Sequence, residues 1–357
     1  MALIALLVCA VAFIIVATTV LKLHPFLALI VAAFGYGVLC GTLSLQQVVD
    51  AVNSGFGDTI SKIGIVILAG AIIGVFLERS GGAYRLAESV LRLTGRGNAP
   101  LAMGVMGYVV SVPVFCDSGF VILAPLGRAL AHKTGASTAA AAIALSLGLY
   151  ATHTMVPPTP GPVAAAGILR ADLGLVILLG LIVSAVTLLA GWAFAVCYAP
   201  RVAPDAASDA PHDTPETPAD APSAGRAALP IVVPLALIVM KSAASLPSQP
   251  FGDGQFAVFV QFIGHPAVAL LLGVLMACTL PARREPGRYS VQGWVGEAVV
   301  AAAVIIVVTG AGGAFGKVIE TSGIAGVVQD RLGGAQLGLW LPFLVATALK
   351  TAQGSST

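Results

Sequence analysis

The stretch ATHTMVPPTPGPVAAAG, residues 151–167, decides the fold class. It lies inside an apolar run, 137–169, that is long enough to cross a bilayer, yet it holds four prolines within six residues. Proline removes a backbone donor and clashes with the preceding turn, so a helix cannot continue through this string. Interrupted backbone at membrane depth is tolerated only where it is buried in protein or lines a cavity. The run therefore predicts a broken membrane helix that borders a binding site.

The composition of the whole chain agrees with a membrane protein. Of 357 residues, 58% are hydrophobic and 10% are charged, and the mean hydropathy is +0.97. Soluble domains carry about 25% charged residues, so a soluble enzyme, a nucleic-acid binder and a disordered protein are excluded. The net charge of +2 says nothing about partners. Five scattered cysteines without a CxxC motif argue against a disulfide framework or a zinc site.

Apolar segments long enough to cross a bilayer recur along the chain. We expect an all-α, polytopic membrane protein, without a cleaved signal peptide because no charge precedes Lys22. The predicted spans are 1–21, 25–41, 61–78, 137–169, 173–199, 228–245, 257–280 and 294–319.

A segment rich in proline and charge, residues 200–227, separates two apolar halves. It cannot bury enough apolar area to offset its chain entropy, so we expect a disordered cytoplasmic linker. The halves are a first transmembrane repeat, 1–199, and a second, inverted repeat, 228–357.

The basic residues orient the chain and predict a re-entrant segment. Twelve of the 18 lysines and arginines fall in loops that we assign to the cytoplasm. Two of these loops, 79–98 and 128–135, flank the apolar segment 99–127, which must then enter and leave on the same side. We expect a re-entrant helical hairpin at 99–127 with its tip at VPVFCDSG, 112–119. The amphipathic stretch 84–96 is expected to lie on the cytoplasmic surface.

The two halves share a local string at an offset of 242 residues. The string E-x-S-G-x-A ends a glycine-rich apolar segment in each half. Because the first half crosses the membrane an odd number of times, the second half has the opposite orientation in the membrane. Inverted repeats with broken helices near the midplane are typical of secondary transporters. The matched residues are Gly74, Glu78, Ser80, Gly81 and Ala83 with Gly316, Glu320, Ser322, Gly323 and Ala325.

The offset also predicts a second hairpin tip at the end of the chain. Adding it to position 113 gives 355, inside TAQGSST, 351–357. We therefore expect the second repeat to be incomplete, with its return arm and later spans, roughly 85 residues, missing.

The first candidate binding site is the hairpin tip, with Asp117, Ser118 and Gly119. Asp117 is the one carboxylate between Glu88 and Asp172. Ionisable groups at membrane depth mark ion or substrate paths, so Asp117 is a candidate proton carrier. The alternative is a helix N-cap made by Asp117 or Ser118. Helix ends at the tip would also aim backbone N–H groups at an anion.

The second candidate site is the proline string itself. His153 is placed to relay protons, or else to bond carbonyls freed by the prolines. Pro162 suits the first position of the restarting helix. The remaining candidates are Thr152, Thr154, Pro158, Thr159 and Gly161.

The third candidate site is the predicted second tip. Its hydroxyl, N–H and carbonyl groups could hold a polyol acid or a sodium ion. The residues are Gln353, Gly354, Ser355, Ser356 and Thr357.

Three strings resemble the signatures of the gluconate permease family, within the ion transporter superfamily. They are VPVFCDSGFVILAPL (112–126), ATHTMVPPTPGPVAAAGILRADLG (151–174) and AQGSST (352–357). The resemblance implies a bacterial inner-membrane proton symporter for gluconate and related sugar acids, with some members taking D-serine or other small hydroxy or amino acids. It also implies a second broken helix beyond Thr357. Gluconate members often carry Glu where this chain has Asp117 and His where it has Thr159, which weakens the assignment to gluconate alone.

We therefore expect a secondary transporter, not an enzyme, that imports a sugar acid or small hydroxy acid by proton symport. Its expected partners are the small organic anion and the lipid bilayer, with no nucleic acid and no cofactor or metal. Sodium-coupled uptake of a carboxylate or of D-serine, a passive anion channel, and a homodimer are alternatives that the sequence leaves open.

Overall fold

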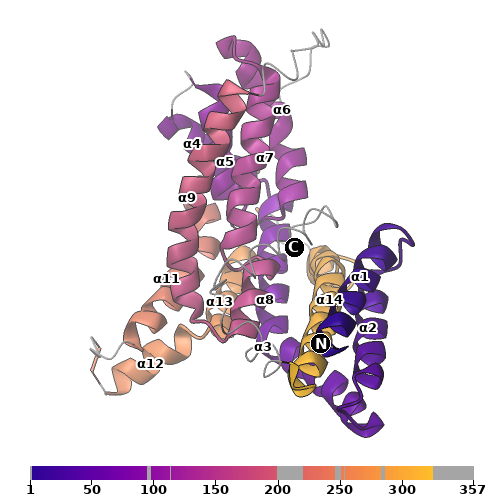
Figure 1. Ribbon diagram of the computed structural model, residues 1–357. Coiled ribbons are helices and arrows are strands. Elements are labelled where there is room, and N and C mark those ends of the chain that lie inside the picture. Colours follow the sequence, from indigo (N-terminus) through magenta and orange to yellow (C-terminus); the bar gives the residue numbers. More distant parts are fainter. Residues whose placement is uncertain are drawn as a thin grey trace. The chain divides into compact units, whose positions relative to one another are not determined.

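The computed structural model describes residues 2–94, 98–112, 114–198, 220–245, 251–252, 254–282 and 286–324. This part of the chain is helical, without a strand (Figure 1). Most of the predicted linker, up to residue 219, and the predicted second tip at 353–357 lie outside the described residues.

Two compact units make up the chain. One unit comprises Met1–Gly64 and Ala303–Thr357, and the other comprises Ile65–Ala302. The chain passes from one unit to the other inside two helices, α3 (Leu45–Arg79) and α14 (Trp294–Thr321). The second unit contains segments from both predicted halves.

The first unit packs α1 (Ala2–Thr19) and α2 (Pro25–Leu39) with the first part of α3 and the last part of α14. Its core is rich in alanine, which lets helices approach closely. The buried Tyr36 of α2 contacts Phe315 edge to face, and its hydroxyl lies 3.1 Å from the Ser322 hydroxyl. This hydrogen bond ties α2 to the end of α14.

The second unit is built around α7 (Thr138–Met155). Against it pack α5 (Ala99–Val110), α6 (Cys116–Thr134) and α9 (Leu173–Cys197) (Figure 1). Glycines bring α5 and α7 together, because a Cβ atom on Gly107 would lie 2.6 Å from the Leu145 carbonyl oxygen. The hairpin is therefore packed directly on the span that carries the proline string.

The predicted hairpin is a pair of helices joined by a short turn. Its second arm runs back along the first, since a Cβ atom on Gly127 of α6 would lie 2.7 Å from Cε of Met103 in α5. The second arm ends at Thr134, beyond the predicted boundary at 127. Its re-entrant path through the bilayer stays a prediction. The predicted surface helix is α4 (Gly82–Thr94), whose apolar side chains, such as Leu86 and Val90, are buried.

Five helical segments of the described chain are long and apolar enough to cross a membrane. These are Leu45–Arg79, Thr138–Leu169, Leu173–Cys197, Ala224–Ala244 and Gly287–Thr321.

The structure corrects the prediction of one continuous helix over 257–280. Two helices, α12 (Gln255–Ile263) and α13 (Pro266–Ala277), meet there at 64° and count as a sixth span only if taken together. Pro266 begins α13 and has no N–H group to continue the helix. A Cβ atom on Gly264 would overlap the Leu237 carbonyl oxygen of α11 (Ala224–Ala244), so the bend is packed against that helix. The helix α11 itself begins four residues before the predicted start at 228.

The two E-x-S-G strings adopt the same turn. The N–H of Ser80 donates to the Phe76 carbonyl, and the N–H of Ser322 donates to the Val318 carbonyl. Gly81 and Gly323 then have φ values of 74° and 78°, a conformation that favours glycine. The repeat therefore extends to local structure at these helix ends, while the inverted relation of the two halves stays a prediction.

Candidate functional site

The hairpin tip occupies the residues between α5 and α6. The N–H of Val114 still donates to the Val110 carbonyl at 3.2 Å, and helix α6 begins at Cys116, where the N–H of Gly119 donates to the Phe115 carbonyl at 2.8 Å. The first three N–H groups of a helix have no carbonyl partner within it. The positive end of α6 therefore lies at the tip, as the sequence predicts.

The proline string breaks the seventh helix as predicted. Helix α7 ends at Met155, and α8 (Pro160–Leu169) follows after four residues that include a cis Pro157–Pro158 peptide bond. The structure corrects one detail, because α8 begins at Pro160 and not at Pro162. Neither proline has an N–H group, so Gly161 supplies the one backbone donor among the first three helical positions. The start of α8 is thus a poorer anion site than the start of α6.

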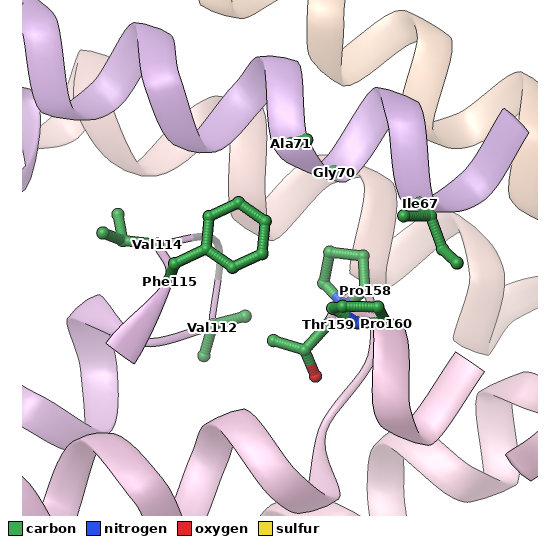
Figure 2. Close-up of a pocket in the computed structure, with 9 residues that line it drawn as sticks. All are labelled: Ile67, Gly70, Ala71, Val112, Val114, Phe115, Pro158, Thr159 and Pro160. Carbon is green, nitrogen blue, oxygen red and sulfur yellow. The ribbon is translucent and has the colours of Figure 1, made fainter. Parts of the chain in front are cut away.

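The tip and the break meet at one small cavity (Figure 2). The Phe115 ring of the tip points into it, opposite Pro158 and Thr159 of the break. Its volume is about 10 Å³, which is room for roughly one water molecule. Ligand sites for small molecules usually exceed about 300 Å³, so the cavity must widen to admit a sugar acid. It is lined by Ile67, Gly70, Ala71, Val112, Val114, Phe115, Pro158, Thr159 and Pro160.

Helix α3 forms the third wall of the cavity, which sequence reasoning missed. A Cβ atom on Gly70 would lie 3.3 Å from the Pro158 carbonyl oxygen and 3.4 Å from its Cβ atom. The absence of a side chain at Gly70 therefore lets the broken span approach α3. The signal available in the sequence was the series Gly64, Gly70 and Gly74 within one apolar span.

The predicted residues of α7 lie around the cavity but do not line it. His153 is buried, and its ring contacts the Phe115 ring edge to face, with 6.1 Å between centroids. Phe115 is thus the shared contact of His153 and the cavity. The Thr152 hydroxyl donates to the Tyr108 carbonyl of α5 at 2.8 Å, and the Thr154 hydroxyl donates to the Tyr150 carbonyl at 2.8 Å.

Two hydroxyl groups near the cavity differ in how they are bonded. Thr159 lines the cavity, and its hydroxyl donates to the Val156 carbonyl at 2.6 Å. Ser111, at the end of α5, is fully buried, and its hydroxyl has no hydrogen-bond partner among the described residues. A buried polar group without a partner is costly, so Ser111 is a further candidate for binding substrate or water. Serine is common near helix ends, so nothing in the sequence distinguished Ser111.

Several predicted site residues lie wholly or partly outside what the structure describes. Asp117 and Ser118 lie in the first turn of α6, but their side chains are outside what the structure describes, as are residues 353–357. Gly119 packs against α7, where a Cβ atom would lie 2.8 Å from Cδ2 of Leu149. Within the described part of the chain, no three His, Cys, Asp or Glu side chains are grouped to hold a metal ion.

The profile of the family described as GntP family permease matches residues 1–357. The chain belongs to the GntP family of permeases. Its relatives include a gluconate permease of Pseudomonas aeruginosa, 33% identical over 96% of this chain and 77% of that protein. An uncharacterized permease of Haemophilus influenzae is 33% identical over 94% of this chain and 71% of that protein. The D-serine transporter DsdX of Escherichia coli is 30% identical over 94% of this chain and 76% of that protein. No solved structure matches the chain.

Family membership confirms the main functional expectations from sequence. The permease is a multi-pass protein of the inner membrane, and it transports gluconate-like small organic anions and is not an enzyme. The cavity where the hairpin tip, the broken span and α3 meet is its candidate binding site.

Proposed function

We propose that the permease imports gluconate or a related sugar acid by proton symport. The observation that supports this most is the meeting of the hairpin tip with the proline break at one small cavity, with His153 in contact with Phe115 of the cavity wall. Broken helices that face each other in this way are the architecture of secondary transporters. The names of the gluconate permease relatives support the substrate class.

In this proposal the substrate carboxylate binds at the start of α6. Backbone N–H groups of Asp117 and Ser118 lie at a positive helix end, which favours an anion, whereas the N–H of Gly119 is already bonded to the Phe115 carbonyl. The single N–H of Gly161 at the start of α8 adds less. Hydroxyls of the sugar acid then bond Thr159 and Ser111.

Asp117 is the proposed proton carrier, with His153 as a relay. A substrate anion and an ionised Asp117 would repel each other in the same small site, so protonation of Asp117 favours substrate binding. Phe115 contacts His153 and borders the cavity, so movement of this ring would open or close the path between them.

Uptake into proteoliposomes tests the proposal. With gluconate, glycerate, D-serine and 3-hydroxybutyrate as substrates, an inward proton gradient should drive accumulation of a sugar acid in sodium-free buffer. Asp117→Asn should abolish gradient-driven accumulation but retain exchange of labelled for unlabelled substrate. Asp58→Asn, on the exposed part of α3, is the matched control and should behave as wild type.

The alternatives give different results in the same assay. Accumulation that requires a sodium gradient would replace proton symport with sodium coupling. Flux without saturation or exchange would indicate a channel. D-serine remains the second candidate substrate because the D-serine transporter DsdX is 30% identical to this chain.

A further inference from the structure

A second hollow in the unit Ile65–Ala302 shares no residue with the candidate binding site. This groove lies between α5, α6 and α7, and its volume is about 240 Å³. Met103, Phe120, Ala124 and Leu145 make its walls apolar. The distance from Phe120 to Arg128 along α6 corresponds to about 12 Å at 1.5 Å per residue, so the groove follows the helix for about two turns.

The polar groups of the groove gather at one end. Arg128, toward the end of α6, and Thr138, the first residue of α7, both line it. Arg128 is exposed, and no ion pair is found for it among the described residues. The nearest acidic residue on the neighbouring helix α4 is Glu88, which is already paired with Arg85 and Arg92. Among the described residues, therefore, no carboxylate compensates the charge of Arg128 at this end of the apolar groove.

We propose that this groove holds an acyl chain of an anionic phospholipid, whose phosphate pairs with the Arg128 guanidinium. The apolar walls match an acyl chain and exclude a small hydrophilic anion. The position of the charge matches a headgroup, since Arg128 lies in the last two turns of α6, within the segment 128–135 that the basic-residue count assigns to the cytoplasmic face. Basic pockets between membrane helices on that face are known to bind anionic lipid headgroups. The lipid would fill the space beside the hairpin arm α6 and hold that arm against α7.

Native mass spectrometry of the purified, delipidated permease tests this site without measuring transport. The protein is titrated with phosphatidylglycerol and with phosphatidylcholine of the same chain length. A single basic residue near a headgroup is worth about fivefold in affinity, so phosphatidylglycerol should bind about fivefold more tightly. Arg128→Gln should remove this preference, and Arg128→Lys should keep it. Arg92→Gln, which removes an exposed arginine of α4, is the control and should leave the preference unchanged.

The groove itself is tested by filling it. Ala142 lines the groove, so Ala142→Phe should weaken binding of both lipids, and loss of two buried methylenes alone corresponds to about fifteenfold. Ala190→Phe adds the same ring on the exposed face of α9 and should have no effect. Equal binding of the two lipids by the wild type would overturn the proposal. So would a preference unchanged in Arg128→Gln, or an affinity unchanged in Ala142→Phe. The two variants change different walls of the site, Arg128 in α6 and Ala142 in α7, so misfolding of one leaves the other as the test.

Discussion

Replacement of Gly107 by alanine should loosen the hairpin from the span beneath it. A Cβ atom there would lie 2.6 Å from the Leu145 carbonyl oxygen and 2.8 Å from the Leu149 nitrogen. Real Cβ contacts are essentially never below 3.0 Å, so α5 must move away from α7 by about 0.4 Å. Both neighbours are backbone atoms, so no side-chain rotation can relieve the overlap. The adjacent hydrogen bond from Thr152 to the Tyr108 carbonyl would lengthen with it.

The expected cost follows from two opposing effects. Overpacking costs about 1–3 kcal/mol, and alanine recovers about 1 kcal/mol of helix propensity relative to glycine. The net destabilisation is up to about 2 kcal/mol, which should lower the melting temperature of the purified permease in detergent relative to that of a matched control. Gly312→Ala in α14 is the matched control, because its Cβ atom would meet nothing within 4 Å and the propensity gain should remain. A Gly107→Ala variant as stable as Gly312→Ala would refute the packing argument.

Three further predictions concern the site and the surface. Gly70→Val should reduce uptake at least tenfold while the protein still folds, because the added methyl groups push the Pro158 break away from α3; wild-type uptake would remove α3 from the site. Ser111→Ala should raise the substrate half-saturation concentration about fivefold, the value of one hydrogen bond, with unchanged maximal rate; an unchanged half-saturation would make its hydroxyl structural. Hydrogen bonds from Arg92, and next from Arg85, lower the pKa of Glu88 below its ordinary value of about 4.3. The ionised Glu88 therefore stabilises α4 fully at a pH above that ordinary value. This stabilisation is lost as the pH falls below about 4.3 and through the lowered pKa. In the Glu88→Gln variant, the melting temperature should no longer show this loss of stability at acidic pH. A melting temperature that depends on pH in the same way in the variant and the wild type would contradict the prediction.

Strong local signals made the membrane architecture predictable. The four prolines between Val156 and Val163 leave no continuous helix, and the polar tip at 112–119 interrupts its span in the same way. The turn after each E-x-S-G string follows from glycine at a position that needs positive φ. Each of these features depends on a few neighbouring residues.

The missed features depend on residues far apart in the sequence. Gly70 belongs to the site only because Pro158 approaches it, and a single glycine in an apolar span does not reveal its partner. The bend at 264–266 was missed because one Gly and one Pro within an apolar run of this length are compatible with a continuous span. Ser111 is distinguished by its burial without a partner, which only the packed structure shows.

The length of α3 also indicates how deep the candidate site lies in the membrane, and therefore what fraction of the transmembrane potential a charge crosses to reach it. At 35 residues the helix is about 52 Å long, so it cannot fit within a hydrocarbon layer of about 30 Å even at a steep tilt. Its exposed polar residues, from Gln46 to Lys62, therefore belong outside that layer, and the apolar remainder matches its thickness. Gly70 is the middle of that remainder. In the proposed symport, a proton that binds at the depth of Gly70 would cross about half of the transmembrane field, which would provide about 1.2 kcal/mol per 100 mV for the binding step.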